Sequence, residues 1–281
     1  MTITGQARKA GVMGWPVGHS RSPVLHGWWL ERHGIDGTYV PLPVRPGDLA
    51  VALRALPILG FAGCNLTIPH KEAAVGLVDV LDPQARRVGA VNTIIVRPDG
   101  TLEGRTTDGF GFVASIRERL PDWRAADGPA VVLGAGGGAR CIVAALIEDG
   151  AREIRLCNRS IERTERLAAD FAPFCAVHPW SERSGAALAG TALLVNATSL
   201  GMDGQPALDV PLGTLPRDAV VADIVYVPLE TPLLAEARAR GNRTVDGLGM
   251  LLHQARPGFA AWFGLMPEVT PALRERIVAT L

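Results

Sequence analysis

The sequence has no excess of charge of either sign, because 28 Lys and Arg residues balance 28 Asp and Glu residues among 281. Such a balance gives no reason to expect nucleic acid or an anionic membrane as a partner. No uninterrupted apolar run approaches the roughly 20 residues that a membrane-spanning helix needs. The stretch from Met1 to Lys9 is short and polar and lacks the apolar core of a secretory signal, so we expect a cytoplasmic protein.

Residue patterns that hold disulfides or metals are also missing. The cysteines are scattered without a CxxC pair and number four: Cys64, Cys141, Cys157 and Cys175. We expect them to be reduced and buried. No plausible metal set follows from the spacing of the histidines near the expected site, which are His19, His26, His70 and His253. We therefore expect no metal centre.

Short apolar strands alternate with helices along the chain, a pattern typical of an α/β protein with parallel sheets covered by helices. At about 150 residues per domain, the length favours two domains. Residues 130–224 have the character of a nucleotide-binding segment, whereas the tail has helices and no strands. We predict a discontinuous first domain, residues 1–107 plus 248–281, with a Rossmann-type domain inserted over residues 108–247.

The same patterning predicts individual elements. Strands are expected over residues 38–42, 63–68, 91–96, 101–106, 130–133, 153–157, 192–196 and 219–224, the third and fourth forming a hairpin. Helices are expected over residues 69–78, 139–148, 160–171, 249–263 and 271–281. A further helix should begin with Ser22 as its cap and end at Gly34. We expect Thr270 to cap the last helix and Pro257 to disturb the one before it.

A glycine-rich turn between a strand and a helix matches G-x-G-x-x-[GA] and consists of Gly134, Ala135, Gly136, Gly137, Gly138 and Ala139. Small residues there permit a tight turn, a close backbone approach to a pyrophosphate and close packing of helix on strand. The N-terminus of the helix then offers free N–H groups to phosphates. Glycine-rich turns also occur for structural reasons alone, but the strand–turn–helix context favours dinucleotide binding.

The end of the next strand distinguishes the two dinucleotides. An NAD site usually places an acidic residue there to bind the ribose 2′-hydroxyl. This sequence has Asn158, Arg159 and Ser160 instead, with Arg163 one helical turn later. Two guanidinium groups suit a 2′-phosphate by charge and by forked hydrogen bonding, whereas the plainer interpretation is two solvated arginines. We predict NADP.

Polar clusters in the first half lie where strands should end, which is where open α/β sheets bind ligands. Such side chains could converge on a small polyhydroxylated acid. The clusters are His19 to Pro23, Asn65 to Lys71, Asn92-Thr93 and Thr107 to Gly109.

In order and spacing, these clusters and several later motifs resemble the shikimate dehydrogenase family from about Gly11 to Gly264. The motifs are Gly14 to Pro16 with His19 to Pro23, Asn65 to Lys71, Gly89 to Thr93, Thr107 to Gly109, the glycine-rich turn, Asn196 to Ser199, Asp223 to Tyr226 and Asp246 to Gln254. A linked series is far more specific than any single motif.

The resemblance implies NADPH-dependent reduction of 3-dehydroshikimate to shikimate, a step of chorismate and aromatic amino acid biosynthesis. It implies Lys71 and Asp108 as the catalytic acid–base pair. It also implies a substrate-binding first domain and an NADP-binding inserted domain. The implied substrate ligands are Ser20, Ser22 and Tyr226 at the carboxylate, and Thr67, Asn92 and Gln254 at the ring hydroxyls. The implied cofactor ligands are the glycine-rich turn, Asn158, Arg159, Ser160, Arg163, Thr198 and Gly247.

Plainer roles exist for single residues. Lys71 could be a solvated helix start and Asp108 a helix cap, although their joint occurrence with the other motifs favours catalysis. The sequence also departs from the family, since Thr106 stands where Asn is usual and Gly27 where an amide is usual. Thr106 lies beside the expected substrate site, so it puts the substrate preference in doubt.

Three alternatives remain open, and a fourth is weaker. A quinate/shikimate dehydrogenase that uses NAD would prefer an acidic residue in place of Arg159 and Arg163. A non-catalytic NADP-binding sensor on the same fold would be expected to have lost Lys71 or Asp108. An aminoshikimate enzyme is a further relative, and a Rossmann-type methyltransferase has no support. The oligomeric state, monomer or homodimer, is not determined by the sequence.

Overall fold

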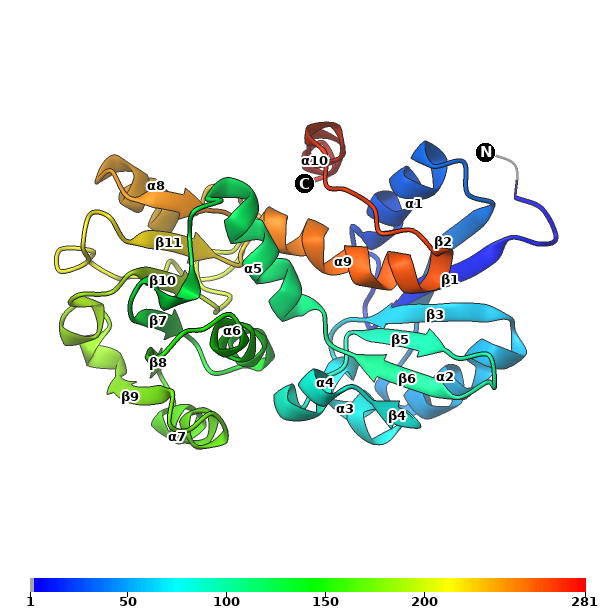
Figure 1. The fold of residues 1–281 in the computed structure, drawn as a ribbon, viewed down its shortest axis with the longest axis horizontal. Coiled ribbons are helices and arrows are strands. Elements are labelled where there is room, and N and C mark those ends of the chain that lie inside the picture. The colour runs from blue at the N-terminus through cyan, green and yellow to red at the C-terminus, as the bar shows by residue number, and fades with distance from the viewer. Residues whose placement is uncertain (1–2) are drawn as a thin grey trace. The chain divides into compact units, whose positions relative to one another are not determined.

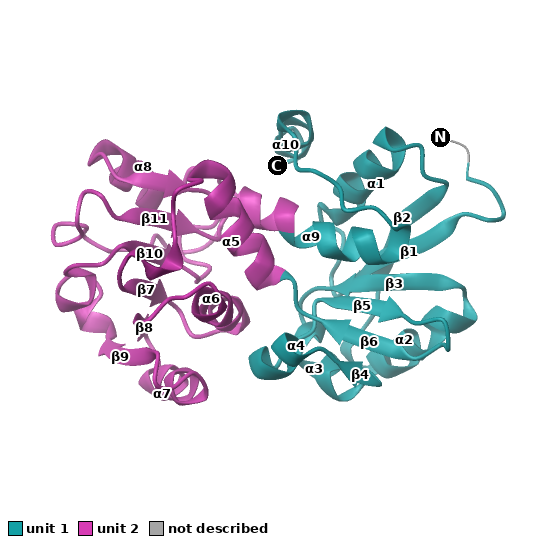
Figure 2. Cartoon of the chain, viewed as in Figure 1, with its two compact units in different colours: residues 1–107, 254–281 teal, residues 108–253 magenta. Residues whose placement is uncertain are grey.

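The computed structural model describes residues 3–281, and the chain divides into two compact units (Figure 2). Unit 1 contains the residues up to Thr107 and those from Gln254 onward, and unit 2 runs from Asp108 to His253. Each unit is an α/β structure around its own sheet, which confirms the predicted fold class. The second division falls at 253/254 rather than at 247/248, inside the single helix α9 (Gly247–Phe263).

The sheet of unit 1 has six strands in the order β2-β1-β3-β5-β6-β4 (Figure 1). Their bounds are β1 Arg8–Gly14, β2 Gly37–Pro43, β3 Phe61–Leu66, β4 Val80–Leu81, β5 Thr93–Val96 and β6 Leu102–Arg105. β1 pairs with β2 and β3 in parallel, whereas β5 is antiparallel to β3 and β6. The predicted hairpin is therefore confirmed as β5–β6.

Helix α2 (Leu49–Ile58) supplies a core to unit 1 through Leu49, Leu53 and Leu56, which recur at the spacing of one helical face. They join strand residues such as Cys64 and Ile94 in one buried cluster. The other helices of this unit are α1 (Ser22–Arg32), α3 (His70–Ala73), α4 (Pro83–Val88) and α10 (Pro271–Val278), together with the second half of α9. Short 3₁₀ turns occur at Pro46–Asp48 and Ala74–Gly76.

A second core of unit 1 is aromatic and joins α1 to α9. Trp29 and Phe259 meet edge to face with centroids 5.3 Å apart, and Trp262 donates from Nε1 to the carbonyl of Ile94 at 2.9 Å. That close approach requires Gly63, because a Cβ there would overlap the carbonyl of Ile94. The tail of helices thus packs on unit 1, as the absence of strands predicts.

The sheet of unit 2 is entirely parallel, with the order β12-β11-β10-β7-β8-β9. Its strands are β7 Ala130–Leu133, β8 Ile154–Asn158, β9 Cys175–Pro179, β10 Leu193–Asn196, β11 Val220–Asp223 and β12 Arg243–Val245. After β9 the chain returns to the other side of β7, so the strand order reverses between β7 and β10. Ligands of open α/β sheets bind at such a switch point, beyond the carboxyl ends of the strands.

Four helices and the start of α9 cover this sheet: α5 (Asp108–Arg119), α6 (Gly137–Glu148), α7 (Ile161–Asp170) and α8 (Pro232–Ala239). Short 3₁₀ turns lie at Ala125–Asp127, Trp180–Glu182 and Ala186–Leu188. α5 packs closely on α6 at Gly109, where a Cβ would lie 2.7 Å from both the Cys141 carbonyl oxygen and the Ala145 methyl.

Two local predictions are wrong. Ser22 does not cap α1, because Arg21 occupies the cap position and Ser22 is already helical. The helix expected over residues 69–78 shortens to α3 plus a 3₁₀ turn, and the Lys71 carbonyl accepts from the distant Val91 amide at 2.8 Å. The expected effect of Pro257 is limited in extent, since α9 continues through it as a 17-residue helix that lacks the bond its N–H would make. Thr270 does cap α10, accepting from the Leu273 amide at 3.2 Å.

Candidate active site

The polar residues of unit 1 gather where β1 and β3 end. The Thr67 amide donates to the Met13 carbonyl at 2.9 Å, and the Trp15 amide donates to the Ile68 carbonyl at 3.1 Å. These bonds continue the pairing of the two strands beyond their last residues. Gly14 makes the approach possible, because a Cβ there would lie 2.5 Å from the Thr67 methyl.

Asn92 is the most constrained of the predicted substrate residues. Its side-chain oxygen accepts from the Thr107 amide at 2.9 Å and from the Thr93 hydroxyl at 3.0 Å. Its amide nitrogen donates to the Thr107 hydroxyl at 3.0 Å and to the Gln254 oxygen at 3.4 Å. Only 2% of Asn92 is exposed, so these partners fix the orientation of its amide. The structure thereby brings two predicted ligands, Asn92 and Gln254, together.

Behind Asn92 lies a buried chain of polar groups that the sequence prediction missed. The Tyr39 hydroxyl donates to the Asn65 side-chain oxygen at 2.7 Å, and the Asn65 nitrogen donates to the Asn92 carbonyl at 3.0 Å. The Ser22 side chain lies near the Tyr39 hydroxyl and weakly opposes the effect of burial on the pKa of Tyr39. Burial is the main cause that raises the pKa of Tyr39 well above its usual value, so the phenol stays neutral. Tyr39 thus helps to hold Asn92 in place through Asn65.

Tyr39 carried no usable sequence signal, because an aromatic residue in an apolar strand is an ordinary core residue. The ring of His26 stacks on it with centroids 3.9 Å apart and planes 3° apart. Burial lowers the pKa of His26 to about 3, which keeps the imidazole neutral. The plain packing role predicted for His26 agrees with this position.

The remaining predicted residues of unit 1 lie on nearby segments. Ser20 follows β1, and its hydroxyl accepts from the Ser22 amide at 3.3 Å. Lys71 lies on α3 beside the buried His70, whose Nε2 bonds the Val44 carbonyl at 2.8 Å. In unit 2, Asp108 is the first residue of α5 and is almost fully buried. The catalytic roles of Lys71 and Asp108 stay predictions.

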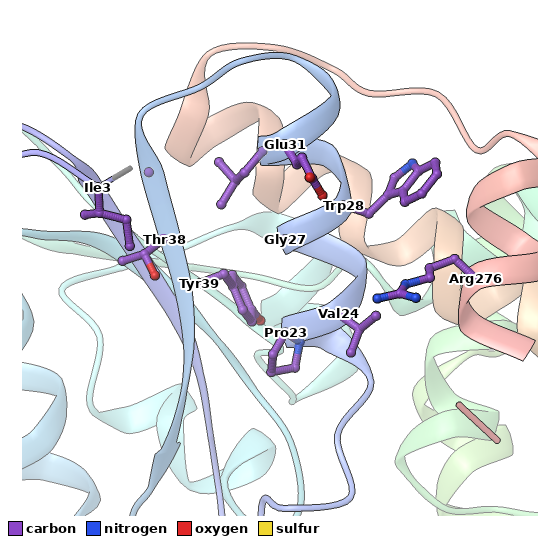
Figure 3. A pocket seen from close by; sticks show the side chains of 11 residues that line it. Ile3, Pro23, Val24, Gly27, Trp28, Glu31, Thr38, Tyr39 and Arg276 are labelled. Atoms are coloured by element: carbon purple, nitrogen blue, oxygen red, sulfur yellow. The ribbon is translucent and has the colours of Figure 1, made fainter. Parts of the chain in front are cut away.

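A separate pocket of about 400 Å³ lies beside α1 in unit 1 (Figure 3). Val24, Gly27 and Trp28 line it from α1, Thr38 and Tyr39 from β2, and Arg276 from α10. Gly27 has no side chain to fill this pocket. Outside the backbone of its own helix, no atom lies within 4 Å of the place where a Cβ would be. No predicted site residue is among the described residues that line this pocket.

The glycine-rich turn in unit 2 has the geometry that a dinucleotide needs. Gly134 has φ +114°, and a Cβ there would lie 3.0 Å from the Ala197 carbonyl oxygen. Gly136 and Gly137 instead face open space, and α6 begins at Gly137 with no side chain capping its amides. Backbone N–H groups at a helix N-terminus without Cβ atoms around them can receive a pyrophosphate. Ala139 is fully buried where α6 packs on the sheet.

The end of β8 presents the two predicted arginines. Asn158 is the last residue of β8, and Ser160 caps α7 by accepting from the Arg163 amide. Within the described residues, no ion pair engages the side chain of Arg159 or Arg163, and both are exposed. Neighbouring Arg140 pairs with Asp170. Two unengaged guanidinium groups fit the 2′-phosphate of NADP.

The other predicted ligands of unit 2 follow β10, β11 and β12. Thr198 comes two residues after β10, Tyr226 three residues after β11, and Gly247 begins α9. A Cβ at Gly247 would overlap the carbonyl groups of Ile224 and Val225. All three positions therefore lie at the carboxyl edge of the sheet, as expected for ligand-binding segments.

The described residues contain no cluster of three or more His, Cys, Asp or Glu side chains that could hold a metal ion. In the same part of the chain, no helix has the length and apolar character needed to cross a membrane. The four cysteines form no disulfide within the described part of the chain, and three of them, Cys64, Cys141 and Cys157, are buried.

An all-parallel sheet with this strand order and a glycine-rich turn after its first strand defines a dinucleotide-binding α/β protein. Comparison with known families is more specific. Residues 12–94 match the family described as shikimate dehydrogenase substrate binding domain, and residues 117–199 match shikimate/quinate 5-dehydrogenase.

Full-length relatives give the same result. The chain is 60% identical over 277 residues to a shikimate dehydrogenase (NADP(+)) of Paramagnetospirillum magneticum, covering 99% of this chain and 100% of the relative. The shikimate 5-dehydrogenase of Thermus thermophilus, solved with NADP(H) and shikimate, is 35% identical with a TM-score of 0.86, over 98% and 100% of the two chains. A quinate dehydrogenase of Corynebacterium glutamicum, solved with NAD, is 31% identical with a TM-score of 0.90, over 97% and 99%. The chain belongs to the shikimate dehydrogenase family.

Proposed function

We propose that this protein catalyses the reversible, NADPH-dependent reduction of 3-dehydroshikimate to shikimate in chorismate and aromatic amino acid biosynthesis. The observation that carries the proposal is its 60% identity, over 99% of its length, to a relative named for the NADP-dependent reaction. The unengaged Arg159 and Arg163 support NADP, and the buried amides of Asn92 and Gln254 support a polyhydroxylated substrate.

Substrate binding relies on groups held in place before the ligand arrives. Asn92 and Gln254 are already hydrogen-bonded to each other, so their side chains lose little further entropy when a substrate with ring hydroxyls binds beside them. Ser20 and Ser22 follow β1 and offer hydroxyl groups to the carboxylate, with Tyr226 assigned to the same end. Thr67, at the end of β3, is assigned to a ring hydroxyl.

The chemistry places negative charge on the C3 oxygen of the substrate. Bound NADPH supplies the hydride. Lys71 donates the proton to the developing alkoxide in the reduction and accepts it in the reverse direction. Asp108 orients the lysine and shares its proton. A cation at this position stabilises the oxyanion as well as protonating it, which is why a lysine suits the role.

The partner in this proposal is a small-molecule substrate. Nucleic acid and membranes have no part in it, and the protein works in the cytoplasm as a monomer or homodimer. The balanced charge supports this, because no excess of basic residues exists to bind polyanions.

A second candidate is an NAD-dependent quinate/shikimate dehydrogenase, favoured by the likeness to the quinate dehydrogenase solved with NAD. Arg159 and Arg163 weigh against it, because an NAD site gains more from an acidic group at the ribose. The two candidates differ in both cofactor and substrate, so one assay separates them.

The experiment follows absorbance at 340 nm with shikimate or quinate, each combined with NADP or NAD. Rapid reduction with shikimate and NADP alone is the expected result. Activity with quinate and NAD would transfer the protein to the second candidate and contradict the argument from the arginines. Absence of turnover in all four mixtures, from protein shown to be folded, would favour a sensor that binds NADP without catalysis, or a substrate altered through Thr106.

A further inference from the structure

Asp223 and Asn196 form a buried polar pair at the carboxyl ends of two neighbouring strands in unit 2. Each is the last residue of its strand, and the parallel register of β10 and β11 places them opposite each other. The Asn196 amide nitrogen donates to Asp223 Oδ1 at 2.9 Å. Asn196 is fully buried and Asp223 is 2% exposed. A carboxylate buried to this extent is costly unless its oxygens are hydrogen-bonded.

Asn196 holds the segment that follows β10. Its side-chain oxygen accepts from the Thr198 amide at 3.0 Å and from the Thr198 hydroxyl at 2.7 Å. Its nitrogen also donates to the Leu200 carbonyl at 3.0 Å, and the Leu200 amide donates to the Thr198 hydroxyl. The segment in turn lies against the glycine-rich turn, because a Cβ at Gly134 would be 3.1 Å from the Thr198 methyl. One amide thus orients Thr198 beside the turn.

Asp223 holds the segment that follows β11. Its Oδ1 accepts from the Val225 amide at 2.9 Å, and its Oδ2 accepts from the Thr231 hydroxyl at 2.8 Å. Tyr226 comes directly after the anchored Val225. Burial raises the pKa of Asp223, while the three donors oppose that rise. The carboxylate is therefore the common anchor of both segments.

We propose that Asp223 is a positioning residue that ties the Thr198 segment to the Tyr226 segment, so that cofactor and substrate ligands of unit 2 are set by one buried carboxylate. The inference rests on the proposed function, in which Thr198 contacts NADP and Tyr226 contacts the substrate carboxylate. Asp223 touches neither ligand and acts through Asn196 and Val225. A purely structural network would change stability alone, whereas a positioning network also changes ligand affinity.

Thr231 provides a mild way to perturb the anchor without removing it. Thr231→Val keeps the shape and removes the hydroxyl from Asp223, whereas Thr231→Ser keeps the hydroxyl. Thr231 also caps α8 through the Leu234 amide, so Asp223→Asn, which retains that cap, is measured alongside. Thr191→Val is the matched control: Thr191 is equally buried, and its hydroxyl bonds the Ala187 carbonyl at 3.1 Å before β10 begins.

Two readouts are taken on folded protein: the Kd for NADP by calorimetry, and KM for shikimate with kcat. Thr231→Val and Asp223→Asn should each raise both the Kd and the KM by about 3- to 10-fold. This corresponds to part of the free energy of one charge-assisted hydrogen bond being lost from ligand binding. Thr231→Ser should restore both constants. Thr191→Val should lower the unfolding midpoint and leave both constants unchanged.

The positioning role would be overturned if Thr231→Val and Thr191→Val had the same Kd for NADP and the same KM for shikimate. It would also be overturned if Thr231→Ser failed to lower these two constants relative to Thr231→Val. Failure of the proposed function looks different: the wild type would bind NADP and turn over no shikimate. In that case the Kd for NADP alone tests the inference, because the position of the Thr198 segment affects cofactor binding even when no substrate is turned over.

Discussion

His26 should make the protein lose stability as the pH falls, by an amount that the structure specifies. The imidazole is fully buried, and burial lowers its pKa from 6.5 to about 3. Neither ring nitrogen has a hydrogen-bond partner among the described residues, although the Asn65 side chain lies close enough to oppose the effect of burial slightly. In the unfolded chain the His26 imidazole therefore binds a proton near pH 6.5, whereas in the folded chain it binds one only near pH 3.

The sign follows from this difference. A group whose pKa is depressed on folding contributes stability that is complete above its unfolded pKa and lost as the pH falls below it. Each pH unit below 6.5 costs about 1.4 kcal/mol, so at pH 5 His26 lowers the free energy of unfolding by about 2 kcal/mol. The loss continues toward pH 3, where the folded state begins to bind the proton.

The assay is urea unfolding followed by tryptophan fluorescence at pH 7.5 and pH 5.0. His26→Phe keeps an aromatic ring against Tyr39 and removes the titrating group, so its loss between the two pH values should be smaller than that of the wild type by about 2 kcal/mol. His33→Gln removes an exposed histidine and should behave like the wild type. The reasoning is refuted if His26→Phe and the wild type lose the same free energy.

Lys71→Ala should lower kcat by about 100-fold or more through loss of the proton donor, with little change in Kd for shikimate; steady-state rates and calorimetry check this, and an unchanged kcat would remove its assigned role. Replacing both Arg159 and Arg163 by Ala should raise KM for NADP by about 10- to 100-fold and leave KM for NAD nearly constant; equal changes for the two cofactors would contradict a 2′-phosphate contact. Gly134→Ala should cost about 1–3 kcal/mol, because φ is +114° there and the new Cβ meets the Ala197 carbonyl; denaturant unfolding at wild-type stability would refute the strain argument.

The fold was largely accessible from sequence because its signals are local. Apolar strands, the glycine-rich turn and the capped last helix each involve fewer than about a dozen consecutive residues. The parallel sheet of unit 2 followed from the alternation of strands and helices. Local rules were wrong where a distant group competed. Ser22 looks like a helix cap, but it lies inside α1 with its side chain near Tyr39 of β2, and the Lys71 carbonyl accepts from the Val91 amide.

In the candidate site, too, some residues could be identified from sequence and others depend on contacts between distant segments. The family resemblance singled out Asn92, just before β5, and Gln254, on α9, and the structure places the two side chains in contact. The residues that hold these side chains in place could not be identified from sequence, because their hydrogen bonds join segments far apart in the chain. Asp223 appears in the motif that precedes Tyr226, yet its function as an anchor depends on the register that sets it opposite Asn196.

Burial explains why such residues escape sequence analysis and why they matter. Tyr39 in a strand and His26 in a helix are chemically ordinary until the fold removes water from both. Once buried, the phenol and the imidazole are each held neutral, and their stacked rings leave the Tyr39 hydroxyl to donate to Asn65. The support of Asn92 therefore depends on a neutral aromatic pair whose properties arise from packing. A sequence shows which groups can react, whereas only the fold shows which groups hold them in place.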